Sequence, residues 1–308
     1  VIDGDTASIE YAKIAGLTEV PVDQRNPDFT TSYGLGEVML AAIERGCQRI
    51  VVGLGGSATM DGGLGMLQAL GVQAYDEKGN KVGPYGKELT KVTDISFENL
   101  SSKVADVHIK VACDVDNPLC GRLGASRIYG PQKGATEQQI KTYDQALNNF
   151  SDIIEEKMHR RYKNGSGAGA AGGIGFALHA LGAELVSGAE LLGEAIHIEA
   201  AITEADLVFT GEGESNLQTL SGKAPGYVAA CGQKHNVPVI LISGSLVGDL
   251  EPLRQNFSGC FSITNKPMSL EASMKDAPQL LYEQTKQIIH FVTSLKTRHE
   301  GQSKEQHS

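Results

Sequence analysis

Short apolar runs alternate along the chain with stretches in which apolar residues recur every three or four positions. The runs at residues 50–52, 205–210 and 238–243 are typical of buried strands. The stretches at residues 35–46 and 226–236 predict helices with one apolar side. From residue 205 onward strands and helices alternate, which predicts a parallel sheet. The expected fold class is therefore α/β.

A glycine-rich turn, Gly53–Gly63, lies between the predicted strand at 50–52 and a predicted helix that begins at Leu64. Such a turn lets backbone N–H groups converge on an anion at the positive end of the helix. Asp61 adds a carboxylate that is suited to hold a metal ion or an attacking hydroxyl group. The turn therefore indicates phosphate chemistry. The alternative is a purely structural turn, in which the glycines only supply positive φ angles.

A second polar loop follows the predicted strand at 104–113. Asp114 and Asp116 lie at the end of that strand, and two carboxylates at such a position commonly bind hydrated Mg²⁺. The alternative is a turn rich in Asp and Asn that Pro118 closes. Further along, Thr136 is predicted to cap a helix that runs to about residue 162.

Three more loops carry candidate chemistry. Lys133 lies in a loop bounded by glycines, where it either meets a phosphate group or is a solvated lysine. A second glycine stretch, Gly165–Gly175, runs into a predicted helix, so it is expected to cradle an anion or to form a close-packed turn. Polar residues at 211–223 follow a predicted buried strand, and ligands of parallel sheets bind at this edge.

Composition excludes several classes of protein. The net charge of −10 argues against a nucleic-acid or anionic-membrane partner. No apolar run is long enough to span a bilayer. The cysteines are scattered, odd in number and without zinc-site or redox spacing, which favours free thiols in a reducing cytoplasm: Cys47, Cys113, Cys120, Cys231 and Cys260.

A nicotinamide-dependent dehydrogenase is the main rival hypothesis from the residues alone. Gly53, Gly55 and Ala58 fit the dinucleotide-binding spacing, and Asp76 lies about twenty residues further on, where a ribose-binding acid is expected. Against this, Asp61 would repel a pyrophosphate. The chain has no Walker-type lysine motif and no serine nucleophile elbow. Loops rich in Gly, Asp, Asn, Glu and Lys without these motifs suit phosphoryl transfer.

Taken together, five motifs resemble the type I glycerate kinase family, in the family's order and over nearly the whole chain. They are Val52–Gly63, Cys113–Leu119, Tyr129–Ala135, Gly167–Gly173 and Asp206–Gly213. The resemblance implies ATP-dependent phosphorylation of D-glycerate to a phosphoglycerate. It also implies two α/β domains, a flavodoxin-like parallel sheet and an α/β domain inserted into it.

The resemblance also implies a division of the chain. Residues 1–204 would form the inserted domain, residues 205–298 the C-terminal half of the flavodoxin-like domain, and residues 299–308 a disordered tail. Family members begin with several tens of residues before the position that matches Val1, so the flavodoxin-like domain is expected to be incomplete and activity weak or absent. The alternative function is a non-catalytic chain that binds sugar acids or nucleotides.

The candidate site follows from these loops. The catalytic candidates are Asp61, Asp114, Asp116, Glu212 and Lys223, with Asp114 and Asp116 also as metal ligands. The substrate- and phosphate-binding candidates are Gly53, Gly55, Gly56, Ser57, Thr59, Lys133, Gly169, Gly172, Asn216, Gln218 and Thr219. Where the family commonly has Arg-x-Asp, this chain has Glu214-Ser215-Asn216, and Asn216 cannot act as a base. ATP and Mg²⁺ are the expected cofactors, glycerate the expected small-molecule partner, and a monomer or homodimer the expected state.

Overall fold

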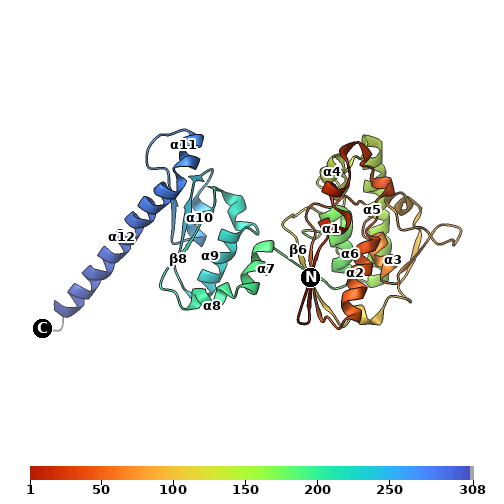
Figure 1. Cartoon of the computed structure of the whole chain (residues 1–308), viewed down its shortest axis with the longest axis horizontal. Helices are drawn as coiled ribbons and strands as arrows, with labels where there is room; N and C mark the ends of the chain where they lie inside the picture. The colour runs from red at the N-terminus through yellow and green to blue at the C-terminus, as the bar shows by residue number, and fades with distance from the viewer. Residues whose placement is uncertain (306–308) are drawn as a thin grey trace. The chain divides into compact units, whose positions relative to one another are not determined.

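The computed structural model describes the backbone of residues 1–305 and the side chains of residues 1–295. The chain divides into two units, Val1–Ser187 and Gly188–Ser308 (Figure 1). Each unit contains helices and a largely parallel sheet, so the predicted α/β class is confirmed. Among the described helices, none combines the length and the apolar character needed to cross a membrane.

The sheet of the first unit has five strands in the order β1-β2-β3-β6-β7. Only the β1–β2 pair is antiparallel. The predicted strand at residues 50–52 becomes β3, at the centre of the sheet, where Ile50 and Val52 are fully buried. The strands are β1 (Ile2–Asp3), β2 (Thr6–Glu10), β3 (Arg49–Gly53), β6 (His108–Ala112) and β7 (Glu184–Val186), with a separate antiparallel pair formed by β4 (Gln73–Tyr75) and β5 (Asp94–Ser96).

Six α-helices belong to the first unit. They are α1 (Ala12–Ala15), α2 (Tyr33–Glu44), α3 (Leu64–Ala69), α4 (Ala125–Tyr129), α5 (Glu137–Met158) and α6 (Ile174–Ala180). Thr136 caps α5 as predicted, because its hydroxyl accepts from the backbone of Gln139 while the Gln139 side chain accepts in return from the Thr136 backbone. Short 3₁₀ turns connect these elements at Leu17–Glu19, Val22–Gln24, Pro27–Phe29, Gly86–Lys91, Ser102–Val104, Pro131–Lys133 and Ala170–Gly173.

The second unit is built on a parallel sheet in the order β12-β10-β8, which confirms the predicted parallel pairing after residue 205. Its strands are β8 (Val208–Thr210), β10 (Val239–Ser243) and β12 (Gly259–Ser262), with a small pair of β9 (Glu214–Ser215) and β11 (Ser245–Leu246). Its helices are α7 (Gly188–Ala195), α8 (Ile198–Thr203), α9 (Ala224–His235), α10 (Glu251–Asn256), α11 (Leu270–Lys275) and α12 (Ala277–Glu305), with a 3₁₀ turn at Leu217–Leu220.

Strand β10 supplies both cores of the second unit, because its side chains alternate between the two faces of the sheet. Leu241 packs in one core with Val228 of α9, and Ile242 in the other with Leu280 of α12. All five residues of β10 are buried. The continuous apolar run of this strand, visible in the sequence, is therefore explained by burial on both faces.

The boundary between the units lies earlier than the expected boundary at residue 204. Helices α7 and α8 belong to the second unit because they pack against α9 there. Ile202 of α8 lies in the same core as Val228, and a Cβ added to Gly193 of α7 would lie 2.2 Å from the Tyr227 ring. The identification of the units as an inserted and a flavodoxin-like domain stays a prediction.

Helix α12, blue in Figure 1, continues to Glu305, past the start of the tail expected at residue 299. Residues 306–308 lie outside the described residues.

Candidate functional site

A cavity of about 280 Å³ lies beside the first glycine turn in the first unit. Strands β3 and β6 bring its walls together, because Gly53 pairs with Ala112 and the loops that follow share one edge of the sheet. Four loops that are distant in sequence line the cavity: Gly53–Ser57, Ala112–Val115, Tyr129 with Gln132 and Lys133, and Ala170–Ala171. The structure thus places four of the loops singled out from the sequence around one space, whereas the polar residues at 211–223 belong to the second unit.

The first glycine turn presents free backbone donors. Leu54 N–H donates to the Ala112 carbonyl at 3.5 Å and Ala58 N–H donates to the Ala15 carbonyl at 2.8 Å. Between them, no group among the described residues accepts from the N–H groups of Gly55, Gly56 or Ser57. Three consecutive unpaired N–H groups beside a cavity suit an anionic oxygen.

Lys133 extends into this region and is only 2% exposed. Its Nζ donates to Ser57 Oγ at 2.9 Å and to the Thr59 carbonyl at 2.7 Å. Within the described part of the chain, no carboxylate forms an ion pair with it. Burial lowers the Lys133 pKa to about 7, although the negative charge of Asp61 opposes this fall. Thr59 is itself buried, and its hydroxyl lies 2.9 Å from the Tyr11 hydroxyl.

Asp61 is fully buried and does not line the cavity. Its Oδ2 accepts from Ser32 Oγ at 2.6 Å, from Ser32 N at 2.7 Å and from Gly65 N at 3.2 Å, and its Oδ1 accepts from Gly63 N at 3.1 Å. Burial raises the pKa of Asp61, while the hydrogen bonds from Ser32, Gly63 and Gly65 oppose that rise. The carboxylate therefore binds the starts of α2 and α3 and leaves no oxygen turned to the cavity lining.

The two carboxylates after β6 differ in position. Asp114 lines the cavity, whereas Asp116 does not and accepts at Oδ1 from Ser166 Oγ at 2.6 Å. The described residues contain no cluster of three or more His, Cys, Asp or Glu side chains that could hold a metal ion. Mg²⁺ usually keeps several waters and takes only one or two carboxylates together with phosphate oxygens. Asp114 is thus a suitable donor for a metal ion that arrives with phosphates.

The second glycine stretch packs closely against the first. Gly62 N–H donates to the Gly172 carbonyl at 3.0 Å, and Gly169 N–H donates to the Asn117 carbonyl at 2.9 Å. Gly172 has a φ of +70°, and a Cβ there would lie 2.2 Å from the Thr59 carbonyl oxygen. Gly169 and Gly172 therefore shape the wall without lining the cavity, as a close-packed turn does.

Several lining residues were not among the candidates. Cys113, Tyr129 and Gln132 lie within the five motifs, so motif membership was the available signal, and Cys113 and Gln132 directly precede the candidates Asp114 and Lys133. The Cys113 thiol donates to the Val115 carbonyl at 3.4 Å, and burial raises its pKa. A reduced, protonated thiol in the cavity wall contributes shape more than charge.

Asp76, which the dehydrogenase hypothesis would place at a ribose, has a local role instead. Its Oδ1 accepts from the backbone N–H groups of Lys78 and Asn80, and its Oδ2 accepts from the Asn80 amide. The side chain closes the turn after β4, outside the cavity lining. The structure gives the dinucleotide hypothesis no support at this residue.

In the second unit Glu212 is the centre of a polar cluster. It accepts from Thr219 Oγ1 at 2.6 Å, from Lys223 Nζ at 2.9 Å and from Ser215 Oγ at 3.0 Å. Burial alone would raise the Glu212 pKa, but the hydrogen bonds from Thr219, Lys223 and Ser215 outweigh it and lower the pKa. Lys223 stands at the N-cap of α9, whose first turn offers unpaired N–H groups except at Pro225, which has none.

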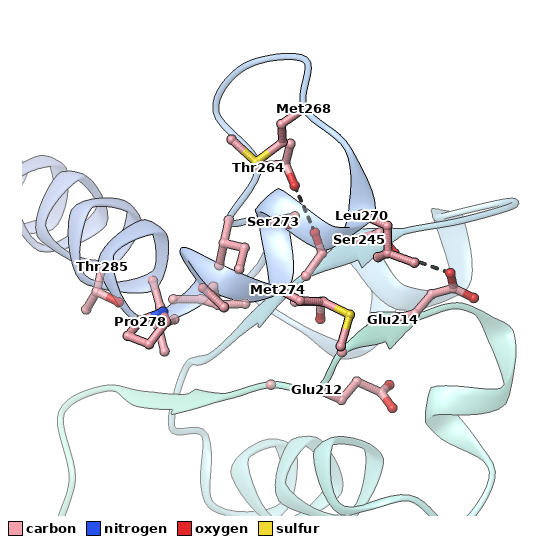
Figure 2. Close-up of a pocket in the computed structure, with 18 of the residues that line it drawn as sticks. Glu212, Glu214, Ser245, Thr264, Met268, Leu270, Ser273, Met274, Pro278 and Thr285 are labelled. Atoms are coloured by element: carbon pink, nitrogen blue, oxygen red, sulfur yellow. Dashed lines mark hydrogen bonds between the residues drawn. The ribbon is translucent and has the colours of Figure 1, made fainter.

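Glu212 also lines a large pocket of about 1280 Å³. The pocket lies at the C-terminal ends of β8 and β10 and is closed on another side by α11 and α12, where Met274 and Pro278 contribute. Figure 2 shows the Met274 side chain extending from α11 toward the segment that carries Glu212. Asn216 and Gln218 lie outside this pocket, and Asn216 Oδ1 accepts from the Gln218 N–H to start the 3₁₀ turn.

Comparisons with known proteins match nearly the whole chain to one family. The glycerate kinase family matches residues 1–293. The chain belongs to the glycerate kinase family. Its relatives include a glycerate kinase of Bacillus subtilis (strain 168), 41% identical over 96% of this chain and 78% of that protein. A glycerate 2-kinase of Escherichia coli (strain K12) is 45% identical over 89% of this chain and 73% of its own length.

A solved structure agrees with this family assignment. A crystal structure from Salmonella typhimurium LT2 that carries the name glycerate kinase 2 is 40% identical to the chain, with a TM-score of 0.73. The match covers 95% of this chain and 77% of that one. Membership of a kinase family implies the use of a nucleotide and a small-molecule acceptor with an alcohol group.

Proposed function

We propose that the chain transfers the terminal phosphoryl group of ATP to a hydroxyl group of D-glycerate, with Mg²⁺ as the cofactor. The observation that supports this proposal most is the cavity beside the first glycine turn. Three free backbone N–H groups, the Lys133 amine and the Asp114 carboxylate surround it. Anion donors next to one carboxylate match phosphoryl transfer, in which positioning and charge stabilisation supply most of the catalysis.

The proposed roles follow from the contacts. The N–H groups of Gly55, Gly56 and Ser57 bind the oxygens of a phosphate or of the glycerate carboxylate, and Lys133 in its charged form adds a fourth donor beside Ser57. Asp114 holds Mg²⁺ together with phosphate oxygens. Bound Mg²⁺ supplies neutralisation of the developing charge. Asp116 keeps the loop in place through Ser166.

The second unit contributes a separate anion-binding loop in this proposal. Lys223 and the first N–H groups of α9, other than Pro225, which has none, bind phosphate oxygens, and α9 is long enough to carry a favourable dipole. Glu212 orients the Lys223 ammonium through their 2.9 Å ion pair. Thr219 and Ser215 fix the Glu212 carboxylate for that task.

A coupled assay of ADP release with D-glycerate, ATP and Mg²⁺ tests the proposal. We expect glycerate-dependent turnover, and we expect Asp114→Asn to reduce it by about a hundredfold because one of the few metal donors is lost. Asp106→Asn is the matched control, since Asp106 is an exposed carboxylate outside both pockets. Turnover that Asp114→Asn leaves unchanged would remove the metal assignment.

The same assay addresses the alternative of a binding-only chain. ATP binding measured by calorimetry together with no turnover would replace the kinase proposal by nucleotide binding without catalysis. No binding and no turnover would reject both.

A further inference from the structure

The hydrogen-bond partners of Asp61 match its ionised form and oppose the rise that burial causes in its pKa. Three of its four hydrogen-bond partners are the backbone N–H groups of Ser32, Gly63 and Gly65, which can only donate. The fourth, Ser32 Oγ, also accepts from the Met66 N–H, so its proton is directed to Asp61. Ser32 is the N-cap of α2, where the helix dipole favours a negative charge. A protonated acid would find no backbone acceptor among these partners.

A fully buried carboxylate requires a compensating charge. None of the described lysines and arginines forms a direct ion pair with Asp61. The buried cation nearest along the hydrogen-bonded turn is Lys133, which binds the carbonyl of Thr59, two positions before Asp61. The other titratable groups facing this region are the Tyr11 hydroxyl on Thr59, the Tyr143 hydroxyl of α5, which interacts electrostatically with Asp61, and Cys113, Asp114 and Tyr129 in the cavity wall.

We propose that Asp61 is a positioning residue and does not touch substrate: its buried negative charge favours the ammonium form of Lys133 beside the glycine turn, and its hydrogen bonds fix that turn against α2 and α3. This inference rests on the proposed function only in that the charged Lys133 is taken to serve a phosphate site. It replaces the direct catalytic role that the sequence suggested for Asp61.

The charge relation has a direct consequence at Lys133. Burial favours the neutral amine and the Asp61 carboxylate favours the ammonium. Removing the charge of Asp61 while keeping its shape therefore leaves burial, which lowers the Lys133 pKa, without the charge that opposed it. Removing one of its hydrogen-bond donors, by contrast, loosens the structure but leaves the charge in place.

The test is an NMR titration of the ε-carbons of ¹³C-labelled lysines, with Lys133→Met used to identify the resonance. In the unmodified chain we expect Lys133 to titrate near its pKa of about 7. In Asp61→Asn we expect the midpoint to move to lower pH, because a nearby negative charge that favours the ammonium is lost. Ser32→Ala, which removes the 2.6 Å bond to the same carboxylate, is the matched structural control and should keep the midpoint of the unmodified chain.

Equal midpoints in the unmodified chain and in Asp61→Asn would overturn the proposal, as would an ordinary lysine titration in the unmodified chain. If Asp61→Asn does not fold, the pH dependence of urea unfolding of Lys133→Met serves instead. Without the compensating cation the folded-state pKa of the buried carboxylate rises further above its unfolded value, so between about pH 6 and pH 4 Lys133→Met should gain stability relative to Lys223→Met as the pH falls. No difference between these two variants would also overturn it. None of these measurements needs turnover, so an inactive chain with the expected titrations would reject only the proposed function.

Discussion

Lys133 and Lys223 stand in similar loops of the sequence, each next to a glycine and shortly before a helix, yet the two units give them opposite surroundings. Lys133 is 2% exposed, has no direct ion pair among the described residues, and binds a hydroxyl and a carbonyl. The Lys223 side chain is 41% exposed and forms a 2.9 Å ion pair with Glu212. Two lysines in similar sequence surroundings therefore differ in their environment. The charge of Lys133 is opposed by burial, whereas the charge of Lys223 is partly solvated and paired with Glu212.

Glycines of the two units also differ in how closely they are packed, and replacing the more crowded glycine gives the largest expected change in stability. Gly172→Ala forces a side chain into a left-handed backbone position and within 2.2 Å of the Thr59 carbonyl, which holds Lys133. We expect a loss of about 4 kcal/mol in the free energy of unfolding, measured by urea denaturation. Gly213→Ala in the second unit is the control, because a Cβ there meets nothing within 4 Å and should change stability little. Equal losses would contradict the tight packing of the two glycine stretches.

The second prediction compares the lysines directly. Lys133→Met removes a buried donor from the proposed anion site, so we expect turnover and phosphate affinity to fall by about a hundredfold. Lys223→Met removes a partly exposed donor that is already paired with Glu212, and we expect a loss of about tenfold. Steady-state kinetics and calorimetry with inorganic phosphate measure both. A larger loss in Lys223→Met would reverse the ranking of the two loops.

The contrast between these lysines marks the limit of what the sequence predicted. The period of apolar residues gave the central strands β3 and β10, and the motif order gave the loops that meet at the cavity, because both depend on local pattern. The role of Asp61 depends on Ser32, which lies in another element and carried no motif. The burial of Lys133 likewise depends on loops that are distant in sequence.

The domain boundary shows the same limit. Helices α7 and α8 look in sequence like the end of the first half, and only their packing on α9 assigns them to the second unit. Packing between distant segments is the information that a single local pattern does not contain.

The third prediction concerns pH. The Lys133 pKa of about 7 lies below the ordinary lysine value, so the ammonium form decreases as the pH rises through 7. Phosphate affinity should therefore fall by about tenfold between pH 6 and pH 8, after correction for the ionisation of phosphate itself. Lys223→Met should retain this dependence and Lys133→Met should lose it.

The stability of the chain should also depend on the ionisation of Lys133. Between pH 7 and the ordinary lysine pKa, Lys133 is protonated in the unfolded chain and neutral in the folded chain, so its contribution to stability rises with pH across that window.

The smallest expected effect lies in the second unit. Thr219→Val removes the 2.6 Å hydrogen bond to Glu212 but keeps the size of the side chain. Because Lys223 and Ser215 still hold the carboxylate, we expect a loss of only about 1 kcal/mol in the free energy of unfolding. The Glu212 pKa should rise, since one of the bonds that lower it is gone. Thermal denaturation and a ¹³C titration of the glutamate carboxyl groups measure these changes.

Ser32→Ala in the first unit removes the hydroxyl that donates to a fully buried carboxylate. It should lower the free energy of unfolding by more than Thr219→Val does, because no solvent can replace the lost donor. A greater loss in Thr219→Val than in Ser32→Ala would show that burial does not set the difference between the two polar clusters.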